Sequence, residues 1–450
     1  MDIFAKRAFD HSYHIDPIVR SLLDTDFYKL LMLQFIWKKY YNTRVSFAVT
    51  NRTKSVKLAE IIDIDLLRSH LDYARGLRFR ESELVWLRGQ TFYGVRGLFE
   101  EAFLDFLRTF QLPEYTLEKE VVDGVETGQF QLEFHGTWPE STMWEIYALE
   151  IINELRYRSI MRGMNRSQLD IMYARAKVKL YDKLEQLNTL ETLNLTDFGT
   201  RRRHSFLWQE HCVVTAKEVL GSKFTGTSNA YLAMKYDLEA KGTNAHELPM
   251  VLAALANSDE ELKDSQYEVL RQWQNVYRGD LLVMLPDTFG TTQFLEGLSP
   301  MMAIAWKGAR PDSKDPIEGG EELIEFWKRT DPAHAHEKLI IFSDGLDVHL
   351  PNHTPQGSDI LTLQKHFEER VKIGFGFGTN LTNDFTDCHP LDAKAMKPVS
   401  LVCKVKSADG RGAVKLSDVQ SKATGNKEDV ERYQRVFGSK GVKIGTTPTV

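Results

Sequence analysis

The feature of the sequence that most constrains the fold is a repeated alternation of short apolar segments, sharp turns and amphipathic helices from Asp197 onward. This alternation is typical of a parallel β/α architecture. Buried strands are predicted over four of the apolar segments, at residues 281–285, 302–306, 339–342 and 371–375. The turns read Asp197-Phe-Gly-Thr, Thr225-Gly-Thr-Ser-Asn, Gly242-Thr-Asn-Ala-His-Glu, Asp287-Thr-Phe-Gly-Thr, Arg310-Pro-Asp-Ser, Ser343-Asp-Gly-Leu-Asp and Gly374-Phe-Gly-Phe-Gly-Thr-Asn. These junctions approach the eight of a (β/α) barrel, so we expect the turns to share the C-terminal face, where binding residues collect.

The N-terminal part of the chain has a different pattern. At 450 residues the chain exceeds the ~250–300 at which a single hydrophobic core usually stops growing, so more than one packed unit is expected. Residues 1–140 combine a helical pattern at 26–40 with alternating, strand-like runs at 44–50 and 128–134. They are therefore predicted to form an α+β domain.

The remaining boundaries follow from two further changes of pattern. A helical stretch over residues 141–187 leads into the barrel, and the catalytic domain is expected to occupy residues 141–390. In residues 391–450, apolar runs at 399–405 and 413–416 flank the sequence Ser-Ala-Asp-Gly-Arg, which is a hairpin signal. This last segment is predicted to be rich in strands and to pack back on the N-terminal domain.

Composition and charge exclude several classes of protein. The formal net charge of -6 argues against a general nucleic-acid surface. Cys212, Cys388 and Cys403 lie far apart, without the Cys-x-x-Cys spacing of zinc sites, which indicates a reducing compartment. The start, Met-Asp-Ile-Phe-Ala-Lys-Arg, lacks the apolar stretch of a signal peptide, and no uncharged apolar run reaches the ~20 residues of a membrane span. We therefore expect a cytoplasmic protein with no membrane or nucleic-acid partner.

Two glycine-rich turns are candidate phosphate sites. Gly374-Phe-Gly-Phe-Gly-Thr-Asn follows a predicted strand, so its backbone amides and Thr379 are placed to cradle a phosphate. It has neither P-loop nor dinucleotide-binding spacing, and a purely structural turn explains it about equally well. The second turn, Thr-Gly-Thr-Ser-Asn, offers hydroxyl donors at Thr227 and Ser228. Capping of the next helix by Ser228 or Asn229 is an equal alternative.

Charged and aromatic side chains also follow predicted strands. Carboxylates occur at four such ends, at Asp287, Asp312, Asp344 and Asp347. Each is suited to binding sugar hydroxyls, to orienting a hydrated Mg²⁺, or simply to capping a helix. Phe198-Gly-Thr-Arg-Arg-Arg joins an aromatic face to guanidinium groups that pair with carboxylate or phosphate, although a solvated charge run is the usual alternative. Tyr28 and Lys29 lie at a helix start, where capping by a preceding Thr25 or Asp26 is a sufficient structural account.

His246 is the candidate nucleophile. It lies at a predicted strand end beside Glu247 rather than on the apolar face of a helix. A neutral imidazole attacks phosphoryl groups, but local chemistry alone leaves this role a minority interpretation. No His-Glu-x-x-His zinc signature occurs in the chain.

Taken together, these motifs resemble those of the nicotinate phosphoribosyltransferase family, over most of the chain. The matching segments, in order, are Thr25-Asp-Phe-Tyr-Lys, Gly136-Thr-Trp-Pro-Glu, Phe198-Gly-Thr-Arg-Arg, Gly226-Thr-Ser-Asn, Gly242-Thr-Asn-Ala-His-Glu, Arg310-Pro-Asp-Ser, Ser343-Asp-Gly-Leu-Asp and Phe377-Gly-Thr-Asn-Leu-Thr. Single motifs of this kind are weak, but the ordered set would be hard to obtain by chance.

The resemblance implies an α/β fold: an irregular type II phosphoribosyltransferase (β/α) barrel, with an N-terminal α+β domain that the C-terminal segment completes. It implies a homodimer with shared active sites. The implied reaction, in NAD salvage, joins nicotinate to phosphoribosyl pyrophosphate and gives nicotinate mononucleotide and pyrophosphate. Such an enzyme is a C–N bond-forming ligase that uses glycosyl transfer chemistry. ATP hydrolysis through a phosphohistidine at His246 drives it, and Mg²⁺ binds mainly through the substrate phosphates, so no protein metal ligands are predicted.

The resemblance also implies a role for individual residues. It places the pyridine ring between Phe198 and Tyr28, with the tyrosine coming from the neighbouring subunit, and it places Arg201 and Arg310 near the carboxylate or the phosphates. The implied site is completed by Asp312 and Asp344 near the ribose, by Thr227, Ser228 and Ser313, and by a 5′-phosphate cradle of Gly345, Gly376, Gly378 and Thr379.

Two positions bear on substrate choice and on departures from the family. Related nicotinamide-using enzymes have an aspartate where this chain has Ser228, and a hydroxyl there favours nicotinate because it donates to a carboxylate. Lys314 replaces the glycine of the family's Asp-Ser-Gly-Asp-Pro, which either adds charge near pyrophosphate or occupies a solvent-facing turn. The alternatives are a nicotinamide or quinolinate phosphoribosyltransferase and a non-catalytic phosphosugar-binding regulator.

Overall fold

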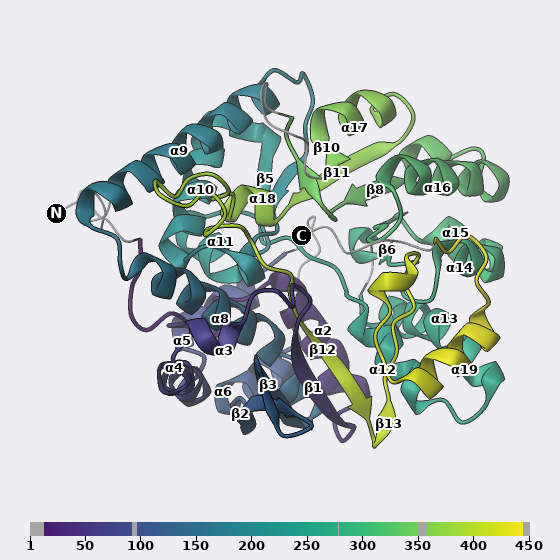
Figure 1. The fold of residues 1–450 in the computed structure, drawn as a ribbon. Coiled ribbons are helices and arrows are strands. Elements are labelled where there is room, and N and C mark those ends of the chain that lie inside the picture. Colours follow the sequence, from purple (N-terminus) through teal and green to yellow (C-terminus); the bar gives the residue numbers. More distant parts are fainter. Residues whose placement is uncertain (1–12, 92–96, 278, 350–357, 444–450) are drawn as a thin grey trace.

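The protein is represented by a computed structural model that describes residues 13–91, 97–277, 279–349 and 358–443. Residues 1–7, on which the signal-peptide prediction rests, lie outside the described residues. Figure 1 shows an antiparallel sheet in the lower part of the molecule and a parallel sheet above it. No helix in the described ranges combines the length and the apolar character that crossing a bilayer requires.

The antiparallel sheet has the strand order β13-β12-β1-β3-β2. Its strands are β1 (Arg44–Asn51), β2 (Tyr115–Val122), β3 (Val125–Thr137), β12 (Leu401–Ala408) and β13 (Arg411–Gly412). Because β12 pairs with β1, the C-terminal segment completes the N-terminal sheet, as the sequence predicted.

The β12–β13 hairpin confirms one sequence signal and corrects another. Asp409 and Gly410 form its two-residue turn with φ values of 44° and 78°, the positive φ that such a tight hairpin requires. The predicted strand at 413–416 was wrong. The paired strand ends at Gly412, and beyond it Lys415 makes only an isolated bridge to Thr424.

The parallel sheet has the strand order β5-β4-β11-β8-β7-β6, with every pairing parallel. Its strands are β4 (Leu195–Asp197), β5 (Phe224–Thr227), β6 (Val283–Met284), β7 (Gly308–Ala309), β8 (Leu339–Phe342) and β11 (Lys372–Phe377). A short separate pair joins β9 (Leu346–Asp347) to β10 (Ser358–Asp359). The predicted strands at 281–285, 339–342 and 371–375 are thus confirmed as β6, β8 and β11.

The strand predicted at residues 302–306 was wrong. This segment lies in helix α15 (Pro300–Ala305), and the neighbouring strand β7 starts only at Gly308. The Ser299 side chain accepts a hydrogen bond from the Met302 backbone N–H, and Pro300 occupies the first helical position, so the Ser-Pro pair starts a helix. The apolar run alone did not distinguish a buried helix from a buried strand.

The helical stretch predicted at 141–187 is two helices, α8 (Trp144–Met161) and α9 (Arg166–Asn188). Asn165 caps α9 by accepting from the Gln168 N–H, which separates the two helices. Nearly every side chain of α8 is buried, and α8 packs against β1, β12 and the short helix η1 (Thr200–Arg202). The helix α8 therefore lies between the antiparallel sheet and the first turn of the parallel unit.

The other helices cover the two sheets (Figure 1). They are α2 (Phe27–Lys39), α3 (Leu58–Ile61), α4 (Ile64–Gly76), α5 (Glu81–Gly89), α6 (Glu101–Thr109), α7 (Trp138–Ser141), α10 (Phe206–Leu220), α11 (Ala230–Tyr236), α12 (Glu247–Leu255), α13 (Asp259–Val276), α14 (Thr291–Gly297), α16 (Pro316–Thr330), α17 (Ile360–Phe367), α18 (Thr379–Thr382) and α19 (Lys427–Phe437), with short 3₁₀ turns at Gly221–Lys223, Gly279–Leu281, Ala335–Glu337 and Gln420–Lys422.

Candidate active site

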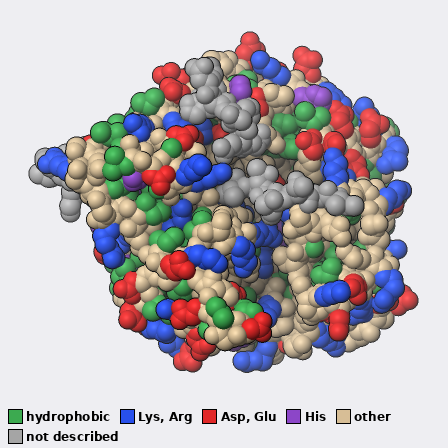
Figure 2. All heavy atoms as spheres, in the orientation of Figure 1, with side chains coloured by type: hydrophobic (Ala, Val, Ile, Leu, Met, Phe, Trp, Pro, Cys, Tyr) green, Lys and Arg blue, Asp and Glu red, His purple; other side chains and the backbone are tan. Residues whose placement is uncertain are grey.

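A cavity lies where the C-terminal ends of the parallel strands face the C-terminal segment. Side chains that follow β4, β5, β7, β8 and β11 form its wall, together with side chains of β12 and of the segment after β13. Figure 2 shows Lys and Arg side chains gathered around the hollow in the middle of this face. The predicted site residues that line the cavity are Tyr28, Phe198, Arg201, Ser228, His246, Arg310, Asp312, Asp344, Gly345, Gly378 and Thr379.

His246 forms the N-cap of α12 and is buried in the cavity wall. No named strand precedes its loop, contrary to the sequence prediction; the bridge between Thr227 and Ala240 is isolated. The loop packs tightly on the start of α2, since a Cβ added to Gly242 would lie 2.6 Å from the Tyr28 backbone nitrogen. Glycine at this position therefore lets the His246 loop approach the helix that carries Tyr28.

Both ring nitrogens of His246 have polar partners. Nδ1 lies 2.9 Å from Thr288 Oγ1, and Nε2 lies 3.0 Å from Asp312 Oδ2 and 2.9 Å from Lys415 Nζ. With the proton on Nδ1, the ring donates to Thr288 and the Nε2 lone pair accepts from Lys415; with the proton on Nε2, the ring donates to Asp312. Burial, with the Lys415 cation, lowers the pKa of His246 to about 4, although Asp287 and Asp312 oppose the shift. The imidazole is therefore neutral near pH 7.

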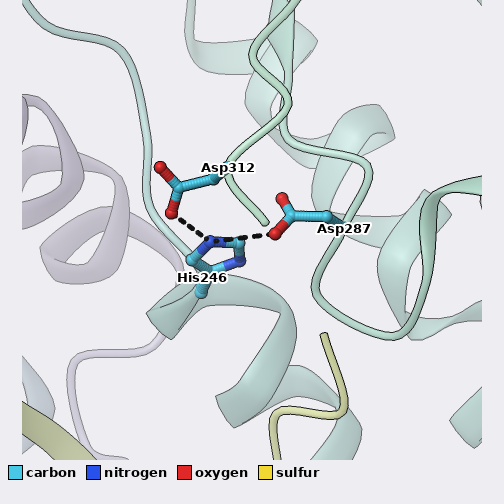
Figure 3. A group of neighbouring side chains, drawn as sticks. All are labelled: His246, Asp287 and Asp312. Carbon is cyan, nitrogen blue, oxygen red and sulfur yellow. Dashed lines mark hydrogen bonds and ion pairs between the residues drawn. The ribbon is translucent and has the colours of Figure 1, made fainter. Parts of the chain in front are cut away.

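His246, Asp287 and Asp312 together have the chemistry of a metal-ligand set. The sequence suggested the two carboxylates for a hydrated Mg²⁺, but it did not place the histidine with them. Figure 3 shows Asp287 and Asp312 on either side of His246, and one ligand atom of each lies within 4.8 Å of the others. Nε2 of His246 is 3.7 Å from Asp287 Oδ2. The Lys415 ammonium also lies 3.5 Å from Asp287 Oδ2, so a fixed cation already balances part of this carboxylate charge.

A second group of charges lies at the ends of β7 and β8. Arg310 donates to Asp312 Oδ1 at 3.3 Å and to the Asn244 carbonyl at 3.0 Å, which ties it to the His246 loop. Burial opposes ionisation of Asp312, but Arg310 and the neighbouring His246 hold the pKa of its carboxyl well below the usual range. Asp344 instead pairs with Lys422 at 2.6 Å. The site thus keeps Asp312 ionised beside Arg310 and His246.

An aromatic and arginine-rich pocket occupies the other side of the cavity. A Cβ added to Gly376 would lie 2.2 Å from the Phe198 ring, so glycine on β11 makes room for that ring. This chain's own Tyr28 lines the same cavity, and its hydroxyl pKa is raised by burial and by Glu145. Arg201 is 3.6 Å from Glu145. An aromatic ring and a guanidinium of this kind suit a planar anion.

Ser228 does not face this pocket with a free hydroxyl. Its Oγ donates to Asp26 Oδ1 at 2.5 Å, and Asp26 is buried. Although Asp26 precedes α2, its side chain makes no capping hydrogen bond, so the capping account of this motif was wrong. The next residue, Asn229, caps α11 by accepting a hydrogen bond from the Leu232 N–H, as one sequence alternative predicted.

Two models of one protein family match the chain. A model described as the nicotinate phosphoribosyltransferase (NAPRTase) family matches residues 193–440, and a model of that family's N-terminal domain matches residues 23–153. The chain belongs to the nicotinate phosphoribosyltransferase family. Together the two models cover both sheets and the cavity between them, which confirms the suspected family.

Solved structures of this family share the fold. A nicotinate phosphoribosyltransferase from Porphyromonas gingivalis is 27% identical with a TM-score of 0.77, over 94% of this chain and 100% of that one. One from Vibrio cholerae is 28% identical with a TM-score of 0.80, over 96% of each chain. A putative one from Saccharomyces cerevisiae, 24% identical with a TM-score of 0.79 over 95% and 100%, shows likeness of fold. The predicted α/β fold of the type II phosphoribosyltransferase class is thereby confirmed.

Three residues that the family pattern suggested for the site lie behind the cavity wall. Thr227 Oγ1 donates to Asp197 at 2.8 Å, and Ser313 Oγ donates to Asp287 at 2.7 Å, so both hydroxyls hold carboxylates in place. Gly376, which has no side chain, leaves room for the Phe198 ring. These positions therefore act on the site through Asp197, Asp287 and Phe198.

Lys314, the departure from the family pattern, does not add charge to the cavity. Its Nζ lies 2.5 Å from Glu322 on α16 and 3.2 Å from Thr292, and its side chain is largely buried. The positive charge is therefore neutralised within the barrel wall, and neither the pyrophosphate role nor the solvent-facing turn describes it.

Several cavity residues escaped the sequence analysis. Arg52, Lys404, Lys415 and Lys422 line the cavity but come from the antiparallel sheet and the C-terminal segment. Burial, partly offset by Glu145, lowers the pKa of Lys404 to about 8. No motif marks these residues, because isolated basic residues on a strand look like ordinary surface charge. The pairing of β12 with β1 brings them to the cavity at the ends of the parallel strands.

Proposed function

We propose that the chain is an ATP-coupled nicotinate phosphoribosyltransferase that carries a phosphoryl group on His246. The observation that supports this most strongly is the buried imidazole of His246, which faces Lys415, Asp287 and Asp312 in the cavity that also contains Phe198 and Arg201. A neutral imidazole beside a cation is suited to attack a phosphoryl group.

The ribosyl transfer needs little proton movement. The pyridine nitrogen of nicotinate attacks C1′ of phosphoribosyl pyrophosphate, the bond from C1′ to the pyrophosphate oxygen breaks, and pyrophosphate leaves with the electron pair. Positioning and electrostatics dominate such a step. In this proposal Phe198 and Tyr28 hold the ring, Arg201 and Arg310 hold its carboxylate or the phosphates, and Asp312 and Asp344 stabilise the positive ribose in the transition state. Gly345, Gly378 and Thr379 bind the 5′-phosphate.

The phosphoryl step uses the other end of the cavity. Nε2 of His246 attacks the γ-phosphorus of ATP, ADP leaves with the bridging oxygen, and water later hydrolyses the phosphohistidine to phosphate. Lys415 lies near enough to Nε2 to balance the incoming negative charge. Asp287 and Asp312 have the oxygen ligands that suit Mg²⁺, and a phosphate-bound Mg²⁺ would neutralise charge there. Thr288 Oγ1 holds the imidazole in place by accepting a hydrogen bond from Nδ1 of His246.

We further propose that the chain forms a homodimer and acts in the cytoplasm, in the salvage of pyridine nucleotides. The family pattern assigns the ring-stacking tyrosine to the partner subunit, whereas this chain's own Tyr28 lies in the wall of its own cavity. Mass measurement in solution and activity of mixed dimers of Tyr28→Ala and His246→Ala subunits test the shared site.

The test of the function uses labelled ATP. Incubation with γ-labelled ATP is expected to give an acid-labile phosphate on His246, and His246→Ala is expected to lose it while ATP-independent formation of nicotinate mononucleotide persists. Label at another residue contradicts the phosphohistidine. Turnover of nicotinate is compared with that of nicotinamide in the same assays, and preference for the amide contradicts the substrate assignment.

A further inference from the structure

A buried lysine connects the His246 loop to the helix that carries Tyr28. Lys29, on the first turn of α2, has a fully buried side chain. Its Nζ donates to Glu247 Oε2 at 2.6 Å. Glu247 follows His246 directly and begins α12. One ion pair therefore ties the residue after the proposed phosphoryl acceptor to the residue after the proposed ring-stacking tyrosine.

Glu247 is held from several sides. Its second oxygen, Oε1, accepts hydrogen bonds from Trp138 Nε1 and from Thr142 Oγ1, both at 2.6 Å. Thr142 Oγ1 also lies 3.2 Å from Lys29 Nζ. Because charge-assisted hydrogen bonds are short and strongly directional, this carboxylate is fixed relative to α2. The first turn of α12 cannot move without moving Lys29 or breaking this network.

The network continues to the substrate pocket. Lys29 Nζ lies 2.7 Å from Glu145 Oε2, and the other oxygen of Glu145 lies 3.6 Å from Arg201 and 3.5 Å from Lys404. Arg201 and Lys404 line the cavity. A contiguous set of buried charges thus runs from the residue after His246, through Lys29 and Glu145, to two basic groups of the substrate pocket.

We propose that Lys29 is a positioning residue that couples phosphorylation of His246 to tightening of the substrate pocket. This inference rests on the proposed ATP-coupled function. A phosphoryl group on His246 adds negative charge beside Asp287 and Asp312, which favours displacement of the N-cap. Glu247 moves with that N-cap, and Lys29 transmits the movement to α2 and Glu145. Lys29 itself is sealed from the cavity and acts only through its neighbours.

The test separates phosphorylation from its effect on substrate affinity. Glu247→Gln keeps the shape of the side chain and removes its charge. A double variant with Lys29→Gln and Glu247→Gln removes both charges of the pair, because Lys29→Gln alone leaves the buried Glu247 carboxylate without a cation and endangers folding. In the double variant Glu145 keeps Arg201 and Lys404 as neighbouring cations. Lys29→Arg is the conservative rescue. Lys38→Met is the matched control, since Lys38 lies on the same helix and pairs with Glu100 at the surface.

Two quantities are measured for each variant: labelled phosphate on His246 from γ-labelled ATP, and the KM values for nicotinate and phosphoribosyl pyrophosphate with and without ATP. In the wild type and in Lys38→Met, ATP is expected to lower these KM values by roughly 5- to 150-fold, the usual range of coupling between sites. In Glu247→Gln and the double variant the ATP effect is expected to shrink to about twofold or less, with the label retained. Lys29→Arg is expected to recover most of the effect of ATP on the KM values.

The possible results are distinguishable. Retained label with an undiminished ATP effect in Glu247→Gln and the double variant overturns the coupling role of Lys29 and leaves the proposed function standing. Loss of the label in these variants also overturns the coupling role of Lys29, because Lys29 and Glu247 would then be needed for the phosphorylation of His246 itself. Absence of label in the wild type overturns the ATP-coupled function and this inference together.

Discussion

The hydroxyl oxygen of Ser228 lies 2.5 Å from Oδ1 of Asp26 and donates its proton to that carboxylate. This contact changes the sequence argument for acid over amide, because a hydroxyl that donates to Asp26 has no second proton for nicotinate. Burial raises the pKa of Asp26. When Asp26 becomes protonated, it supplies its own proton to Ser228 and frees the serine to donate to the substrate.

Asp26→Asn is expected to improve the use of nicotinate. The substitution removes a buried negative charge beside the proposed carboxylate site, and an effect of about 1 kcal/mol corresponds to a KM for nicotinate roughly fivefold lower. The wild type should bind nicotinate more tightly as pH falls through the raised pKa of Asp26, and the variant should lose that dependence. Nicotinamide turnover in the same variant is the internal control, and a higher nicotinate KM would falsify the arrangement.

Lys415→Met is expected to move the acid limb of phosphohistidine formation to higher pH. Burial and Lys415 hold the pKa of His246 at about 4, so the wild-type imidazole stays neutral and reactive down to that pH. Without Lys415, Asp287 and Asp312 stabilise the imidazolium, and the pKa rises toward the ordinary 6.5. Initial rates of label uptake measured from about pH 3 to 8, a range that includes the wild-type midpoint, check this shift.

The matched control for that experiment is Lys422→Met. Lys422 pairs with Asp344 rather than with His246, so the midpoint of the acid limb is expected to stay at its wild-type pH whatever happens to the rate. Equal midpoints in all three proteins contradict the role given to Lys415.

Thr288→Val is expected to slow label uptake on His246. Thr288 Oγ1, 2.9 Å from Nδ1, favours the tautomer with the proton on Nδ1, in which Nε2 carries the lone pair that attacks phosphorus. Loss of a hydrogen bond worth about 1 kcal/mol corresponds to a rate roughly fivefold lower. Thr288→Ser keeps the hydroxyl and should retain the wild-type rate, whereas equal rates in the valine and serine variants would exclude this orientation of the ring.

Gly376→Ala is expected to weaken nicotinate binding without contact to any substrate. The added Cβ would lie 2.2 Å from the Phe198 ring, so the ring must shift. Loss of good stacking, about 1 kcal/mol, raises the KM for nicotinate roughly fivefold. Gly410→Ala is the control: its φ of 78° also disfavours alanine, but it lies at the β12–β13 turn with nothing within 4 Å, so the KM should not change. A similar rise in both variants would point to general destabilisation.

The amino-acid sequence by itself determined the parts of this protein that depend on local order. Apolar runs before Gly-Thr and acidic turns predicted β6, β8 and β11, and the Asp409-Gly410 pair predicted the hairpin, because turn chemistry and side-chain periodicity act within a few residues. The sequence failed at residues 302–306 for the same reason: an apolar run carries no period, and the Ser299-Pro300 helix start decided the outcome.

The tertiary structure alone decided how the site is charged. The lysines at 404, 415 and 422 reach the cavity because β12 adds to β1, a pairing of strands at least 350 residues apart in sequence that no local pattern encodes. Likewise, Ser228 meets Asp26 and Glu247 meets Lys29 only because the start of α2 lies beside the segments that begin α11 and α12. The sequence determines which residue types the site contains, whereas their protonation states depend on burial and on partners from distant segments.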